Sequence, residues 1–250
     1  MQAPDRWKKW STVALILAAA GCVSTQPVND SGWARNDPNR PHPSVITPGK
    51  GMAPPSDAIV LFDGTDFSEW VSTNGDVRWK IKNGVMVATN TGNLRTRRSF
   101  GDCQLHIEWA TPDVVEGSGQ KRGNSGVFLM DKYEVQMLDS YDNVTYPDGQ
   151  AAAVYGQHPP LVNASRGPGQ WQSYDIVFRR PHFNKRGKLR RPATITLLHN
   201  GVVVQNQQAI LGPTSVPVPK YKAHADALPI SLQDHRNPMR FRNIWVRELE

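Results

Sequence analysis

Short runs in which apolar and polar residues alternate recur along the chain, and two pairs of them are joined by Asn-Gly. The two turns are Asn83-Gly84 and Asn200-Gly201. Both central positions of the favoured hairpin turn need a positive φ, which Asn and Gly adopt most easily, so each pair predicts a β-hairpin. The paired runs are 79–82 with 85–88 and 193–199 with 202–205.

Other runs of the same kind predict further strands, and outside the first 22 residues no window of helical length shows three-four apolar spacing. These runs are 59–62, 104–109, 125–130, 133–139, 171–178, 229–235 and 241–249, with a short turn at Asp131-Lys132 between the third and the fourth. About ten short strands without helices predict an all-β sandwich or jelly roll.

The N-terminus has a different pattern, with a basic start, an apolar run over 13–20 and the sequence Ala-Ala-Gly-Cys ending at Cys22. The run is too short for a mature membrane span and is typical of a secretory signal. Its last four residues resemble a bacterial lipobox, which implies that 1–22 is a lipoprotein signal and that Cys22 carries a lipid anchor. By the same resemblance, Val23 favours the outer over the inner membrane, on the periplasmic side of the cell envelope. The alternative is a plain secreted protein cleaved nearby.

Residues 23–57 are rich in Pro, Asn, Ser and Gly and contain few apolar residues, which predicts a flexible tether. The folded domain is therefore expected over 58–250. Because Cys22 belongs to the lipobox and Cys103 to a strand, the mature domain has no disulfide, and Cys103 is expected to be a small buried apolar residue.

The chain carries a net charge of +7, but no nucleic-acid-binding motif accompanies it, so a nucleic-acid partner is not expected. Part of the charge lies in the run 179–191, which contains no Asp or Glu. Such a run is typical of a solvated hairpin tip. The alternative is contact with anionic lipid headgroups or with another acidic polymer of the envelope.

The run 133–140, Tyr-Glu-Val-Gln-Met-Leu-Asp-Ser, combines a strand pattern with two acids. Because strand side chains alternate, Tyr133, Val135 and Met137 are expected in a core, while Glu134, Gln136 and Leu138 lie on the other face. Asp139 has the wrong parity, and a β-bulge would be needed to bring it to the side of Glu134. The alternative is an ordinary exposed strand face.

The loop 155–163 places His158 between Tyr155 and a rigid Pro-Pro pair. Such a loop can hold an imidazole at the rim of a groove as a ligand-binding or acid-base group. It can equally be an ordered loop in which the histidine bonds only to backbone.

The strand predicted over 229–235 ends in Gln, Asp and His. If it neighbours the strand that carries Glu134, then Gln233 and His235 face that carboxylate across a groove. Otherwise the strand merely continues into a polar loop.

Motifs of the common metal and serine hydrolases are absent: there is no His-Glu-x-x-His, no Cys-x-x-Cys and no nucleophile elbow. Several aspartates offer oxygen ligands without the spacing of a calcium loop. They are Asp139, Asp142, Asp148 and Asp234. The sequence is compatible with a divalent metal and assigns no ligand set to one.

Several segments together resemble the 3-keto-disaccharide hydrolase domain family, from about Ala58 to Leu249. They are Leu61–Gly64 with Trp70, Gly123–Leu129, Tyr133–Ser140, Tyr155–His158, Trp171–Asp175, His199–Gly201, and Leu232–His235 through Phe241–Trp245. The resemblance implies a concanavalin A-like jelly-roll sandwich of two antiparallel sheets, with a carbohydrate substrate in a groove. It also implies cleavage of glycosides that have been oxidised to a ketone at carbon 3.

With this chemistry, we expect Glu134 or His158 to remove the proton at carbon 2, and Asp139 to act as leaving-group acid or metal ligand. The expected substrate-binding residues are Asn124, Gln136, Tyr155, Gln233 and His235. Gln136 replaces the middle acid of the Glu-x-Asp-x-x-Glu strand that laminarinase-type glycosidases carry on this fold, which disfavours ordinary two-carboxylate chemistry. The alternatives are a non-catalytic carbohydrate-binding lipoprotein of the envelope, a conventional glycosidase and a structural lipoprotein.

Overall fold

In the computed structural model, residues 32–215 and 217–249 are described, and the chain divides into two compact units after Val45. Every strand named below lies in the second unit, 46–250. The boundary predicted at Ala58 therefore lies inside this unit. Cys22 and the signal segment are outside the described residues.

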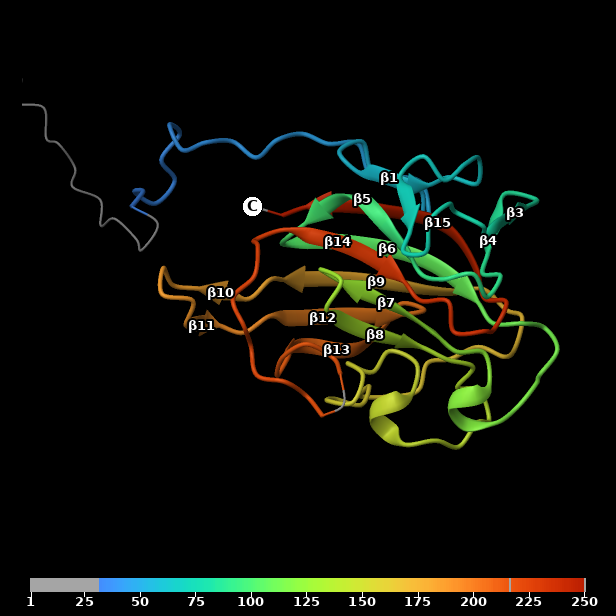
Figure 1. The fold of residues 1–250 in the computed structure, drawn as a ribbon. Helices are drawn as coiled ribbons and strands as arrows, with labels where there is room; N and C mark the ends of the chain where they lie inside the picture. The colour runs from blue at the N-terminus through green and yellow to red at the C-terminus, as the bar shows by residue number, and fades with distance from the viewer. Residues whose placement is uncertain (1–31, 216, 250) are drawn as a thin grey trace, which may run out of the picture. The chain divides into compact units, whose positions relative to one another are not determined.

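The second unit is built from antiparallel strands in two main layers (Figure 1). The eight-stranded sheet runs in the order β13 (Val202–Ala209), β12 (Thr194–His199), β9 (Gln172–Arg179), β6 (Cys103–Ala110), β15 (Arg240–Glu248), β4 (Val85–Val87) and β3 (Lys80–Lys82), with β1 (Ile59–Phe62) also paired to β15. The five-stranded sheet runs in the order β2 (Trp70–Ser72), β5 (Leu94–Phe100), β14 (Leu228–Leu232), β7 (Ser125–Leu129) and β8 (Tyr133–Met137).

The remaining elements are small. A hairpin of β10 (His182–Phe183) and β11 (Leu189–Arg191) forms its own two-stranded sheet. Two 3₁₀ turns, η1 (Gly119–Lys121) and η2 (Pro147–Gly149), are the only helical elements among the described residues. The all-β jelly-roll prediction is confirmed.

Both Asn-Gly hairpins form as predicted, between β3 and β4 and between β12 and β13. The turn residues have positive φ values of 51° and 73° at Asn83 and Gly84, and 53° and 80° at Asn200 and Gly201. The turn between β7 and β8 is wider than expected. Its positive-φ residues are Met130 and Asp131, both at 54°, because Leu129 pairs with Tyr133 and leaves three residues in the loop.

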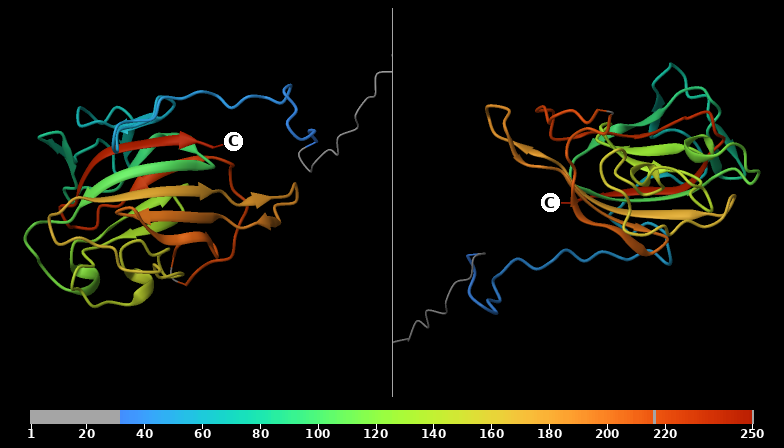
Figure 2. Two further views of the ribbon diagram at one scale, coloured as in Figure 1. Left: turned by 180° about the vertical axis from the view of Figure 1, so that it is seen from behind. Right: turned by 90° about the horizontal axis from the view of Figure 1, so that it is seen from below.

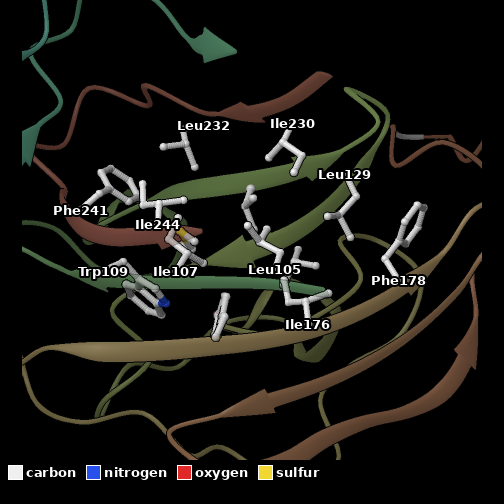
Figure 3. Close-up of a cluster of buried hydrophobic side chains, with 14 of the residues drawn as sticks. Leu105, Ile107, Trp109, Leu129, Ile176, Phe178, Ile230, Leu232, Phe241 and Ile244 are labelled. Atoms are coloured by element: carbon white, nitrogen blue, oxygen red, sulfur yellow. The ribbon is translucent and has the colours of Figure 1, made fainter. Parts of the chain in front are cut away.

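The core fills the space between the two main sheets (Figure 3). The eight-stranded sheet contributes Leu105, Ile107, Trp109, Ile176, Phe178, Phe241 and Ile244, and the five-stranded sheet contributes Leu129, Ile230 and Leu232. Each is at most 1% exposed. Truncating one such side chain to alanine typically costs about 2–5 kcal/mol, so this double layer supplies most of the stability.

Part of the segment predicted as a tether packs on the eight-stranded sheet. The Met52 carbonyl accepts hydrogen bonds from Asn243 Nδ2 at 2.9 Å and Trp245 Nε1 at 3.2 Å. Asp57 accepts from Arg247 Nη2 at 2.6 Å. These contacts explain why a Pro- and Gly-rich segment without apolar periodicity belongs to the compact unit: its backbone and one acid bind side chains of β15.

One buried hydrogen bond crosses between the sheets. The hydroxyl of Tyr174 on β9 donates to the Gln136 carbonyl on β8 at 2.7 Å, and the tyrosine is 0% exposed. We expect Tyr174→Phe to lower the free energy of unfolding by about 1–2 kcal/mol, because the carbonyl loses a buried donor. Chemical denaturation measures the loss. Tyr133→Phe is the matched control, since its hydroxyl contacts the half-buried His224; a loss at Tyr174 no larger than the control would contradict the prediction.

Candidate active site

Strand β8 has the predicted two faces. The Tyr133 ring lies 5.8 Å from that of Phe178 on the opposite sheet, which places Tyr133 in the core. By alternation, Glu134 and Gln136 lie on the outer face of the five-stranded sheet. They are only 6% and 1% exposed, so this is no ordinary exposed strand face.

Both edges of β8 form backbone hydrogen bonds with neighbouring segments. On one side it pairs with β7 in unbroken register from Leu129–Tyr133 to Ser125–Met137. On the other side Gln136 exchanges backbone hydrogen bonds with Ala152 and Ala153 at 2.9 and 3.0 Å. The strand that carries Glu134 is therefore held rigidly, as a catalytic position requires.

A glycine on β7 makes room for the Glu134 carboxylate. A Cβ added at Gly126 would clash with Glu134 Oε1. Gly126 pairs with Gln136 on one side, and its carbonyl accepts from the Gln233 backbone N–H at 2.9 Å on the other. Sequence reasoning had not assigned Gly126, although a glycine inside a strand is a signal for close approach of another group.

The outer face around Gln136 is covered by the loop that contains η1. The Gln136 amide lies 2.9 Å from Gln120 Oε1 and 3.4 Å from Asn124 Oδ1. With its amide rotated by half a turn, Gln136 donates instead to Glu134 Oε1 at 3.2 Å and to the Ser125 carbonyl at 3.0 Å. Asn124 and Gln136 are thus brought together as predicted. Gln120 was missed, because it lies in a glycine-rich loop without periodicity.

Burial dominates the electrostatics of Glu134. It raises the pKa of this carboxyl from its usual range to about 8. None of the ion pairs found among residues 32–215 and 217–249 includes Glu134. A buried carboxylate without a cation is destabilised in its charged form, and it is therefore a stronger base than an ordinary glutamate.

Two tyrosines lie near Glu134. The Tyr146 and Tyr155 hydroxyls are 2.9 Å apart, and the Tyr155 backbone N–H donates to the Glu134 carbonyl at 3.3 Å. Burial, the bond to Tyr155 and nearby charges including Glu134 raise the pKa of Tyr146 above its usual range. Tyr146 is 45% exposed and protonated at neutral pH, so it can offer a hydroxyl and a ring face to a ligand. The sequence had indicated Tyr155 but not Tyr146.

The bulge predicted near Asp139 does not form. Strand β8 ends at Met137 with its register intact, because the following backbone turns away: the Asp139 N–H donates to the Gly123 carbonyl at 3.0 Å. The Asp139 carboxylate is 3% exposed and pairs with Arg122 Nε at 2.7 Å. Both residues line a cavity of about 430 Å³. The bulge that was needed to bring Asp139 to the side of Glu134 is therefore absent, and Asp139 has Arg122 as its charged partner.

The other predicted residues are spread more widely. His158 Nε2 lies 3.2 Å from Gln208 Nε2, on the edge strand β13 of the larger sheet. Strand β14 neighbours β7 and not β8, so Gln233 is one strand away from Gln136, with Gly126 between them. His235 is exposed, beyond the end of β14.

In the part of the chain that the structure describes, no three His, Cys, Asp or Glu side chains converge into a group that could hold a metal ion. The candidate site consists of a buried carboxyl and amides on the outer face of a sheet, with tyrosine hydroxyls nearby. This set of groups can move a proton and hold hydroxyl groups of a ligand.

The profile of the 3-keto-alpha-glucoside-1,2-lyase-like domain matches residues 57–247. The chain belongs to this family. A candidate glycosyl hydrolase from Parabacteroides distasonis is 44% identical, with a TM-score of 0.83 over 90% of this chain and 100% of its own. A second candidate glycosyl hydrolase from that organism, 18% identical with a TM-score of 0.59 over 78% of this chain and 94% of its own, shares the fold. No curated protein matches the chain.

This membership confirms the family resemblance seen in the sequence, and with it a glycoside hydrolase-like enzyme. The description of the family refers to a 1,2-lyase of 3-keto-alpha-glucosides. The roles of individual residues stay predictions.

We expect Gly126→Ala to displace the Glu134 carboxylate, because the new methyl group occupies the position of Oε1. The carboxyl should move toward solvent and its pKa should fall toward the ordinary value near 4.3. Titration of Glu134 by carboxyl-labelled NMR measures this shift. Gly167→Ala is the control, since its nearest neighbour would be Gln170 Nε2 at 3.5 Å. An unchanged pKa in Gly126→Ala would show that the glycine does not position the base.

Proposed function

We propose that this protein cleaves 3-keto-glycosides, including 3-keto-disaccharides, with Glu134 as the base that removes the proton from carbon 2. The observation that supports it most directly is the Glu134 carboxyl, 6% exposed on a rigid strand, whose burial raises its pKa to about 8 and to which the rotated Gln136 amide donates at 3.2 Å. A ketone at carbon 3 acidifies the hydrogen on carbon 2, so a base of this strength suffices for a reaction that an unoxidised sugar would not undergo.

The proposed reaction has two stages. In the first, Glu134 takes the proton from carbon 2, the electron pair forms an enolate with the ketone, and the enolate expels the group at carbon 1 with its bonding electrons. A proton from the site neutralises the departing oxygen. In the second, water adds across the resulting double bond, so the net reaction is hydrolysis. The family's description as a 1,2-lyase-like domain agrees with the first stage.

The neighbouring groups have distinct tasks in this scheme. Gln136, Asn124 and Gln120 form a connected set of amides that can hold sugar hydroxyls or the enolate oxygen. Tyr146 and Tyr155 provide a hydroxyl pair that can donate a proton to the leaving group. Glu134 is preferred to His158 as base because the imidazole lies against Gln208 on a strand of the other sheet.

A non-catalytic carbohydrate-binding protein of the cell envelope is the second candidate. The Tyr146 and Tyr155 pair would serve a binding protein equally well, since aromatic faces and hydroxyls bind sugars without chemistry. A binding protein does not need a buried base. Binding of a 3-keto-glucoside without any turnover would favour this candidate.

We expect Glu134→Gln to lower kcat by about 10²–10⁴-fold on a 3-keto-glucoside, the usual contribution of a positioned base. In the natural protein the rate should rise with pH to a plateau above about 8, because the base acts when deprotonated. The Glu134→Gln variant should lose this rise of the rate with pH. Steady-state kinetics across pH measure both effects, with 3-keto-trehalose as a second substrate and a chelator to test for a metal.

Thermal unfolding provides the control for the same variant. Burial raises the folded pKa of Glu134, so its stabilising proton is fully bound below the unfolded value near 4.3 and is lost as pH rises through about 8. Glu134→Gln should therefore be as stable as the natural protein in acid and more stable above pH about 8, by on the order of a few kcal/mol. A variant that is folded, equally active and still dependent on pH would refute Glu134 as base.

We also propose that the protein is lipid-anchored through Cys22 on the periplasmic side of the envelope, preferentially at the outer membrane. Within the described residues, no helix is long and apolar enough to cross a membrane. Cys22→Ala should abolish acylation of the protein, measured as incorporation of labelled palmitate, and globomycin should cause the natural precursor to accumulate with a mass shift. Unchanged labelling of Cys22→Ala would overturn the anchor and leave the enzymatic proposal untouched.

A further inference from the structure

The hairpin of β10 and β11 stands apart from both main sheets. It connects β9 to β12 and pairs only with itself, as a separate two-stranded sheet. Figures 1 and 2 show it projecting beyond the ends of β9 and β12. A jelly roll does not need this extension, because β9 and β12 are already adjacent and antiparallel.

The hairpin surface is strongly basic. Phe183 packs its ring against Tyr221 at 6.2 Å and His224 at 5.3 Å, which brings the segment around residues 220–222 beside the hairpin. We call the combined cations the basic hairpin surface. Its members are Arg179, Arg180, Lys185, Arg186, Lys188, Arg190, Arg191, Lys220 and Lys222. Every one of them except Arg180 is exposed.

The acids near this surface are concentrated at its base. Asp102 accepts from Arg179 Nη1 at 3.0 Å and from the Arg180 backbone N–H at 2.8 Å, and Asp226 pairs with Arg180 at 2.6 Å. None of the ion pairs found in residues 32–215 and 217–249 includes Lys185, Arg186 or Lys188. The tip therefore presents positive charge that nearby acids do not neutralise.

A cavity of about 610 Å³ lies at the base of the hairpin, and Asp102, Arg179, Arg180, His182 and Arg191 line it. Arg191 Nη2 approaches His182 Nε2 at 3.2 Å. Three guanidinium groups against one carboxylate leave the lining net positive, and guanidinium groups suit the oxygens of a phosphate.

We propose that the basic hairpin surface binds the phosphate groups of anionic phospholipid headgroups at a membrane surface. An acidic polysaccharide fits less well, because the hairpin's aromatic ring, Phe183, is turned inward onto Tyr221 and His224 and leaves no platform for a sugar ring. The place of the hairpin relative to the N-terminal part of the chain also favours a membrane surface. The Leu249 N–H bonds to the Asp102 carbonyl at 2.9 Å, and Ile46, where the compact unit begins, lines a cavity with Gln104 and Arg247. The hairpin base therefore lies near the point where the chain enters this unit.

The expected strength follows from the number of charges. Each lysine or arginine near an anionic bilayer increases binding severalfold, and the effect falls with salt. Reversing the three tip charges should therefore lower vesicle binding by about a hundredfold or more.

The test uses the full chain with Cys22→Ala, so that no acyl chain contributes. Sedimentation is measured with vesicles of phosphatidylcholine alone and of phosphatidylcholine with phosphatidylglycerol. The test variant adds Lys185→Glu, Arg186→Glu and Lys188→Glu. The control adds Lys50→Glu, Arg78→Glu and Lys80→Glu, which make the same charge change at exposed positions elsewhere. All samples retain the N-terminal apolar run, so its contribution is common to them.

The proposal expects phosphatidylglycerol to increase binding above the level that the apolar run gives with phosphatidylcholine alone. This increase should weaken with salt, survive in the control and be lost in the tip variant. The proposal is overturned if the tip variant and the control bind alike, or if phosphatidylglycerol gives no increase. Activity on 3-keto-glucosides should be the same in all three proteins, which separates this surface from the proposed active site.

Discussion

The Glu134 carboxyl is buried and has no cationic partner among the described residues. The rest of the site is arranged around this constraint. An isolated buried carboxylate is costly, so its surroundings must either neutralise it or hold it as a proton carrier. Here Gly126 opens the space, β7 and residues 152–155 hold the strand on both edges, and the loop of Gln120 covers the face. Each of these features would be unnecessary around an ordinary surface glutamate.

The same constraint explains why Asp139 is separate. Two carboxylates sharing one buried face would repel each other, and each would need a cation or a proton. Asp139 instead has Arg122, at 2.7 Å, beyond the end of the strand. Arg122 thus balances the charge of Asp139, whereas Glu134 has no such partner among the described residues and can carry a proton instead. This division suits a reaction driven by one base better than a two-carboxylate glycosidase.

Local pattern predicted the fold well because strand alternation and Asn-Gly turns are encoded within a few residues. The inward face of Tyr133 and the outward face of Glu134 and Gln136 follow from parity alone. The site was only partly predictable, since it depends on strand order: β7 lies between β14 and β8, which no local signal specifies. The bulge failed for a similar reason, because the backbone after Met137 bonds to the Gly123 loop, a contact distant in sequence.

Strand β15 is the last strand of the chain, yet it lies in the interior of the eight-stranded sheet, between β6 and β4, and also pairs with β1. Asn243 on it bonds to Met52, 191 residues earlier in the chain. The central sheet therefore cannot close until almost the whole polypeptide has left the ribosome. Such long-range pairing slows folding, so a newly made chain exposes its apolar strands for longer than a chain with mostly local contacts would.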